Sequence, residues 1–257
     1  MAIPLLQLVA VMLAGLLIGS FLNVLIHRLP RMIRGETPPG FSPAWPRSHC
    51  PRCGQTLRAR HLVPLLSWLA LRGRCGFCRG AISSRYPLVE GATALLFGWL
   101  AWREADPWLL AGGLGLSACL VALAVIDWET GLLPDGLTLP LLWSGLLFNL
   151  HGARAPLAEA VLGAAAGYGA LWALYWLHRL ASGREGLGYG DFKLLAALGA
   201  WLGWRALPTL VLMSALTGLC AAGILMLFGR MSRRDALPFG PYLALSGWVS
   251  WVWGSAL

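Results

Sequence analysis

Two aspartates stand out in a chain that is otherwise poor in carboxylates. Asp127 follows the apolar run Leu114–Ile126, and Asp191 ends the segment 188–191 just before another apolar run. A carboxylate costs about 2.5–3.5 kcal/mol at the centre of a membrane helix and less near the interface, so it is seldom placed there without a role. Two such carboxyls can divide acid and base chemistry, one holding a proton while the other activates water. This pair therefore favours an aspartyl protease that works at a membrane surface.

Four neighbouring residues are candidates for supporting roles. Gly188 and Gly190 precede Asp191 and provide backbone that is flexible or closely approached. Lys193 is the only lysine of the chain, and we expect it to bind lipid headgroups or a substrate carboxylate. Asp135 is expected to cap the N-terminus of the next helix, where its carboxylate would accept backbone N–H groups. Asp191 could also serve as a helix N-cap, and this structural role is the alternative to a catalytic one.

The composition places most of the chain in a membrane. It is 58% hydrophobic and 12% charged, whereas a soluble domain has about 25% charged residues. The long, continuous apolar runs indicate helices and not the short alternating strands of a membrane barrel. The first run lacks a cleavage site and is expected to remain as a membrane helix. We therefore expect an all-α polytopic membrane protein with about eight transmembrane helices. The expected spans lie near residues 4–26, 87–103, 107–126, 132–150, 156–178, 191–204, 208–229 and 238–256.

An arginine-rich insert follows the first span. Residues 28–85 contain eleven arginines and one acid, Glu36. The positive-inside rule places this insert in the cytoplasm, and the resulting topology brings Asp127 and Asp191 to the cytoplasmic edge. We interpret the arginines as topology signals and contacts with membrane lipids, and not as nucleic-acid contacts. The predicted domains are a first transmembrane helix (1–26), a cytoplasmic zinc-binding domain (27–86) and a transmembrane aspartyl protease core (87–257).

Two Cys-x-x-Cys pairs in the insert predict a structural zinc site. Cys50 and Cys53 form one pair, Cys75 and Cys78 form the other, and 21 residues separate the pairs. Each pair can occupy a tight turn that directs both sulfurs at one ion, so that two pairs complete a tetrahedral thiolate site. Disulfides and free thiols are the alternatives, and a reducing cytosol disfavours the disulfides. Four protein ligands leave no open position for catalysis.

At these residues the chain resembles the type IV prepilin peptidases, or leader peptidases, which are membrane aspartyl proteases with a Gly-x-Gly-Asp motif. Family-like motifs occur in family order at residues 19–30, 50–53, 75–78, 85–90, 127–140, 188–193 and 238–242. The resemblance implies that Asp127 and Asp191 are catalytic and that Asp135 is a recurrent acid outside the catalytic pair. It also implies a bacterial inner-membrane enzyme that cleaves the basic leader of type IV prepilins or type II secretion pseudopilins after a glycine.

The same resemblance implies a second activity. Many members methylate the new N-terminal amine with S-adenosylmethionine, and the cysteines match those of the bifunctional members. No glycine-rich nucleotide loop marks a site for this cofactor; Glu36 and Glu90 are candidates, although Glu90 would also suit an ion pair with Arg85. A peptidase without methyltransferase activity, a proton-coupled or ion transporter and a zinc-bearing scaffold are the alternatives. Acids at one membrane edge fit a transporter poorly, and a scaffold leaves the aspartates without a role.

Overall fold

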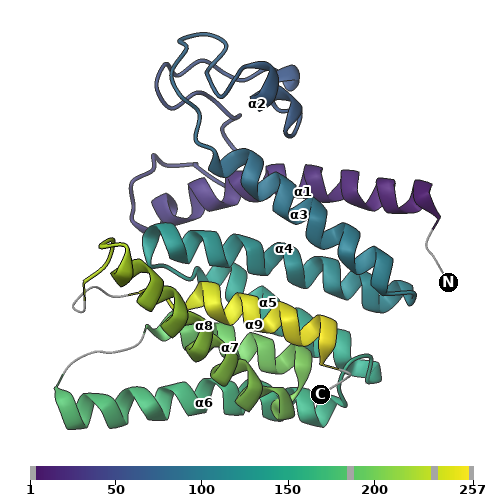
Figure 1. Ribbon diagram of the computed structural model, residues 1–257, viewed down its shortest axis with the longest axis vertical. Coiled ribbons are helices and arrows are strands. Elements are labelled where there is room, and N and C mark those ends of the chain that lie inside the picture. The colour runs from purple at the N-terminus through teal and green to yellow at the C-terminus, as the bar shows by residue number, and fades with distance from the viewer. Residues whose placement is uncertain (1–3, 184–187, 233–236, 255–257) are drawn as a thin grey trace. The chain divides into compact units, whose positions relative to one another are not determined.

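The computed structural model describes residues 4–183, 188–232 and 237–254, and in these ranges the regular elements are helices, with no strand (Figure 1). Each of the eight predicted spans contains a helix. The ends of the first and last predicted segments, residues 1–3 and 255–257, lie outside the described ranges. Contacts divide the chain into two compact units, Met1–Ala122 and Leu123–Leu257.

In the first unit, α1 (Leu5–Ile33) and α3 (Arg85–Arg103) lie side by side (Figure 1). Two glycines of α1, four residues apart, allow this approach. A Cβ on Gly15 would lie 2.7 Å from Ala94 Cα, and a Cβ on Gly19 would lie 2.7 Å from Glu90 Cα. Small residues at this spacing let membrane helices pack closely. The unit also contains η1 (Ala59–His61), α2 (Leu66–Ala70) and most of α4 (Pro107–Thr130).

The helix α1 extends beyond the predicted span 4–26 and ends at Ile33. The charged residues after position 26 do not end it, because Arg28 is 5% exposed and satisfied by the loop that follows. Its guanidinium donates hydrogen bonds to the carbonyls of Ser42 (3.0 Å), Pro43 (3.4 Å) and Pro46 (2.6 Å). These bonds hold the start of the insert against α1.

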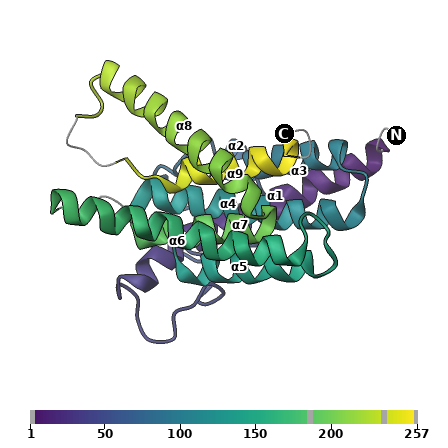
Figure 2. The same cartoon turned by 90° about the horizontal axis from the view of Figure 1, so that it is seen from below.

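In the second unit, α7 (Tyr189–Leu202) is the central helix. It lies against α5 (Asp135–Phe148), α6 (Leu157–Ser182) and α9 (Gly240–Trp253), as Figure 2 shows, and α8 (Leu207–Leu227) packs on α9. Ten of the fourteen residues of α7 are buried, so this helix forms the core of the unit. Two short turns, η2 (Asn149–His151) and η3 (Trp204–Ala206), complete it.

Asn149 fixes the C-terminal end of α7. Its side chain is fully buried, and its amide nitrogen donates to the carbonyls of Ala200 (2.9 Å) and Trp201 (3.0 Å). Its amide oxygen accepts hydrogen bonds from the N–H groups of Arg154 (2.9 Å) and Ala155 (3.0 Å). Because the last carbonyls of a helix have no intrahelical partner, one side chain here satisfies two of them.

The prediction of eight full spans is not confirmed. In the part of the chain that the structure describes, four segments are long and apolar enough to cross a membrane, namely Leu5–Ile33, Pro107–Thr130, Leu157–Ser182 and Trp204–Leu227. The helices α5, α7 and α9 have 14 residues each, which corresponds to about 21 Å against a hydrocarbon core of about 30 Å. The helix α3 has 19 residues but carries Arg85, Glu90 and Arg103. The apolar runs therefore identified the helices correctly but not how many are long enough to span.

The helices α6 and α7 cross at glycines, which makes their packing sensitive to one methyl group. A Cβ on Gly163 would collide with the backbone carbonyl of Gly199. Overpacking of this kind costs about 1–3 kcal/mol, so we expect Gly163→Ala to lower the thermal midpoint in detergent by about 5 °C. Gly169→Ala is the matched control on the same helix, because the added Cβ would lie in open space. Equal midpoints for the two variants would contradict this packing.

Candidate active site

Asp127 and Asp191 line one cavity in the second unit. Asp127 lies in the last turn of α4 and Asp191 in the first turn of α7. Their residues are 6% and 8% exposed, although burying a carboxylate is costly unless it is paired or functional. The cavity has a volume of about 290 Å³ and is also lined by Asp135 and Lys193. The structure thus brings the two candidate acids and both charged candidates for supporting roles to one place.

Gly240, at the start of α9, holds the carboxylate of Asp127. Its N–H donates a 2.8 Å hydrogen bond to Asp127 Oδ2. A Cβ on Gly240 would lie 2.7 Å from the same oxygen, so glycine permits the close approach. No role in the site is predicted for Gly240 from the sequence. The one signal for such a role is its position in the family-like motif at residues 238–242.

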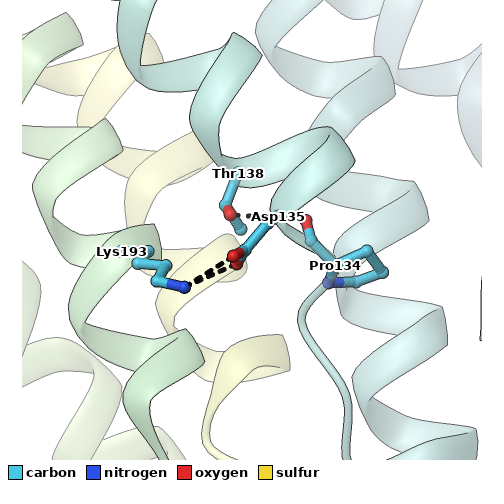
Figure 3. Close-up of polar contacts among 4 residues, drawn as sticks. All are labelled: Pro134, Asp135, Thr138 and Lys193. Atoms are coloured by element: carbon cyan, nitrogen blue, oxygen red, sulfur yellow. Dashed lines mark hydrogen bonds and ion pairs between the residues drawn. The ribbon is translucent and has the colours of Figure 1, made fainter. Parts of the chain in front are cut away.

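Asp135 and Lys193 form an ion pair in the cavity wall (Figure 3). Lys193 Nζ donates to both carboxylate oxygens of Asp135, at 2.7 and 2.8 Å. The prediction that Asp135 caps α5 is wrong, because Pro134 occupies the N-cap position and makes no side-chain hydrogen bond there. The expected partner of Lys193 also changes, from a headgroup or substrate carboxylate to a carboxylate of the protein itself. The pair joins α5 to α7 beside the two buried aspartates.

The glycines before Asp191 have different surroundings. Gly188 is the N-cap of α7 with φ of −82°, and a Cβ there would make an ordinary 3.5 Å contact with Asp191 Oδ2. A Cβ on Gly190 would lie 2.7 Å from Leu133 Cβ, and Leu133 belongs to the loop that lines the cavity. Gly190 is therefore the glycine whose missing side chain lets α7 begin against this loop. Asp191 is not the N-cap of α7, because Gly188 occupies that position and Asp191 lies in the first turn.

The four cysteines of the insert form a cluster in the first unit. The Sγ atoms of Cys50, Cys53, Cys75 and Cys78 lie within 4.8 Å of one another, and those of Cys50 and Cys78 are 3.9 Å apart. Tetrahedral zinc with bonds of about 2.3 Å to sulfur requires sulfurs about 3.8 Å apart. The cluster thus has the donor atoms and the dimensions of a four-thiolate zinc site.

Each cysteine pair lies in a tight turn closed by an isolated β-bridge. The bridge His49–Thr56 encloses the first pair, and Arg74–Ala81 encloses the second. Gly54 follows the first pair with φ of 70°, as glycine-dependent turns require. After the second pair, the residue with a positive φ is Arg79, at 58°, and not Gly80.

The backbone around the cysteine cluster favours partial ionisation. Hydrogen bonds from the N–H groups of Cys78 and Phe77 lower the pKa of Cys75 to about 7. The N–H of Gln55 lowers the pKa of Cys53, but desolvation and the neighbouring thiols raise it to about 11. One cysteine of the cluster is therefore easily deprotonated, whereas deprotonating several of them at once is unfavourable. A divalent cation would make deprotonation of all four favourable, because metal ligation stabilises every coordinating thiolate.

The fold and the site define a class of protein, a helical membrane protein with a buried carboxylate pair in one unit and a four-cysteine cluster in the other. Comparison with known proteins gives the family. Residues 13–104 match the bacterial peptidase A24 N-terminal domain, and residues 114–223 match the type IV leader peptidase family. The chain belongs to the type IV leader peptidase family.

Curated relatives cover nearly the whole chain. A protein from Aeromonas salmonicida is 50% identical over 272 residues, covering 99% of this chain and 94% of the relative. Proteins from Dickeya chrysanthemi and Pseudomonas aeruginosa are 52% and 45% identical, over 95% and 99% of this chain and 92% and 93% of their own. All three are named prepilin leader peptidase/N-methyltransferase. No solved structure matches the chain.

Proposed function

We propose that the protein is a prepilin leader peptidase and N-methyltransferase of the bacterial inner membrane. The peptidase rests on one observation above all, the placement of Asp127 and Asp191 on a single cavity. The methyltransferase rests on the relatives, which carry both activities in their name. The substrates are type IV prepilins or type II secretion pseudopilins, whose basic leader is removed after a glycine.

The two aspartates divide the chemistry of peptide hydrolysis. Asp127 is the base, because the N–H of Gly240 donates to its carboxylate and a hydrogen bond to the charged form favours that form. It removes a proton from water as the water oxygen attacks the scissile carbonyl. Asp191 is the acid and donates a proton to the carbonyl oxygen. When the C–N bond breaks, the leaving amine takes up a proton and both carboxyls return to their starting states.

The active site faces the cytoplasm at the membrane edge. The arginine-rich insert supports this orientation by the positive-inside rule. All eight long helices cross or enter the bilayer, with α5, α7 and α9 too short to reach from one face to the other. Helix ends at membrane depth require protein or water around them, and residues in the first turns of α5 and α7 line the aspartate cavity. A prepilin with an apolar membrane helix and a cytoplasmic leader would present its scissile bond there. The domain division at residues 1–26, 27–86 and 87–257 follows this topology.

The cysteine cluster holds a structural zinc ion, and S-adenosylmethionine supplies the methyl group. Zinc would be bound by Cys50, Cys53, Cys75 and Cys78, whose sulfurs have the spacing of such a site. When bound, S-adenosylmethionine would supply the methyl group, and the acceptor would be the new N-terminal amine that leader cleavage produces.

Mass spectrometry of a processed prepilin tests the proposed function. Membranes containing the protein should cleave a prepilin after the glycine that ends its basic leader. With S-adenosylmethionine present, the mature product should gain the mass of one methylene group. An uncut prepilin would contradict the peptidase assignment. Correct cleavage without the gain in mass would contradict the methyltransferase assignment alone.

The two glycines before Asp191 give a paired test of the site. We expect Gly190→Ala to reduce leader cleavage by at least about tenfold, because its methyl group would collide with Leu133 and displace the catalytic turn; misplacement by about 1 Å can cost about a hundredfold. Gly188→Ala should stay within about threefold of wild type, since its methyl group would meet Asp191 at ordinary contact distance. Initial rates of prepilin cleavage measure both. A larger loss for Gly188→Ala would contradict the assigned roles.

A further inference from the structure

A second cavity, of about 400 Å³, lies beside the cysteine cluster in the first unit. Its walls come from α1, from the insert and from the first turns of α3, and none of its residues line the aspartate cavity. Most of the lining is apolar or aromatic, including Trp68 and Tyr86, with a few polar groups among them. Such a volume and such a lining are typical of small-molecule sites.

Asn23 lines this cavity and carries a buried amide group. Its residue is 2% exposed, and its amide nitrogen donates to the carbonyls of Gly19 (3.3 Å) and Tyr86 (3.1 Å). Its amide oxygen is buried without a hydrogen-bond partner among the described residues. A buried acceptor left without a donor costs about 1–3 kcal/mol. A ligand with an N–H donor would remove that cost.

Glu90 contributes a buried carboxylate to the same cavity. It is 7% exposed, and its Oε2 accepts a 2.8 Å hydrogen bond from the N–H of Leu65. This contact replaces the predicted pairing with an arginine as the observed role of Glu90. Leu65 has φ of 57°, a conformation that costs energy for a residue with a side chain, so Glu90 holds a strained turn in place. The only other acid in residues 1–103, Glu36, lines a different cavity.

We propose that this cavity binds S-adenosylmethionine. Glu90 recognises the positive charge of the sulfonium, and Asn23 accepts a hydrogen bond from an N–H of the adenosyl group. A cation among aromatic side chains and beside a carboxylate is stabilised, and the apolar lining suits a purine. An acyl chain would give the Asn23 amide oxygen no donor and the Glu90 carboxylate no positive charge, and a polyphosphate would be repelled by Glu90. This inference rests on the proposed methyl transfer and locates it in the first unit.

Calorimetric titration of the full-length protein in detergent tests the inference with two ligands that differ in charge. S-adenosylmethionine carries the sulfonium, whereas S-adenosylhomocysteine has a neutral thioether. In Glu90→Gln the amide oxygen can still accept from Leu65, but the charge is lost. We expect its affinity for S-adenosylmethionine to fall by about tenfold or more, and its affinity for S-adenosylhomocysteine to fall by less than about threefold.

Two further variants complete the test. Asn23→Ala should weaken both ligands by similar factors, because they share the adenosyl group. Glu36→Gln is the matched control and should bind both ligands as the wild type does. Zinc content reports that each variant is folded. Wild-type affinities in Glu90→Gln and Asn23→Ala, in a protein that methylates prepilin, would overturn this location and leave the proposed function intact. A wild type that binds neither ligand and transfers no methyl group would overturn both.

Discussion

Asp127→Asn and Asp191→Asn are each expected to abolish leader cleavage, with initial rates lower by about 10⁴-fold. The amide can neither take a proton from water nor donate one from a neutral carboxyl, so either change removes one of the two proton transfers. Both proton transfers belong to one step, the attack of water on the scissile carbonyl, and a single remaining acid cannot perform both. The double variant should therefore be no less active than either single variant, since effects within one catalytic unit are not additive.

The fold should survive both changes, which separates lost chemistry from lost structure. The amide is close in size to the carboxyl, and the amide oxygen of Asp127→Asn can still accept the hydrogen bond from Gly240. Both side chains are buried, and replacing a buried charge by a neutral group of the same shape is often neutral or stabilising. We therefore expect thermal midpoints equal to or above that of the wild type.

Two control variants test whether the loss of cleavage is specific to Asp127 and Asp191. Glu129→Gln changes an exposed acid two residues from Asp127 and should leave cleavage unchanged. Asp135→Asn changes an acid in the same cavity but keeps an oxygen that Lys193 can bind, and this half-exposed ion pair is worth about 0–1 kcal/mol; its cost should stay below about tenfold. Normal cleavage by either aspartate variant, or a loss in Glu129→Gln as large as theirs, would rule out the assigned pair.

The positions of the helices were predictable because membrane helices need uninterrupted apolar sequence, and this chain marks the gaps with glycine, proline and charge. Each predicted span contains a helix for that reason. The length of α1 was not predictable, because Arg28 is satisfied by carbonyls of a loop that follows it. Nor was the number of full spans, since apolar residues serve both lipid-facing helices and a buried core helix such as α7.

The sequence predicts those residues of the candidate site that residue type and local spacing mark, and not the contacts between distant segments. Buried acids at the ends of apolar runs are conspicuous, and Cys-x-x-Cys spacing identifies the cluster. The contact between Gly240 and Asp127 joins distant parts of the chain, and no local pattern encodes it. The N-cap expected for Asp135 failed for the same reason, because a partner from α7 competes for its carboxylate.

Removal of one cysteine of the cluster is expected to release the metal and unfold the insert. The wild type should carry about one zinc ion per chain, and Cys50→Ser should reduce this to a small fraction, because a neutral hydroxyl replaces a thiolate ligand. The insert is short of regular structure, with η1 and α2 between α1 and α3, and structural zinc supplies about 10–16 kcal/mol of apparent binding energy in small modules. Elemental analysis of the purified protein gives the stoichiometry, and limited proteolysis gives the state of the insert.

Cys220→Ser is the matched control, because Cys220 is an exposed cysteine of α8 outside the cluster. It should keep the zinc stoichiometry and the protease resistance of the wild type. Loss of the metal should also abolish binding of S-adenosylmethionine, since Cys50 and Cys75 form part of the wall of its proposed cavity. Cleavage sites opened by proteolysis should fall between residues 34 and 84, where the backbone depends on the cluster. A wild type purified without metal, or a Cys50→Ser variant that keeps one zinc ion per chain and a protected insert, would show that these cysteines serve another purpose.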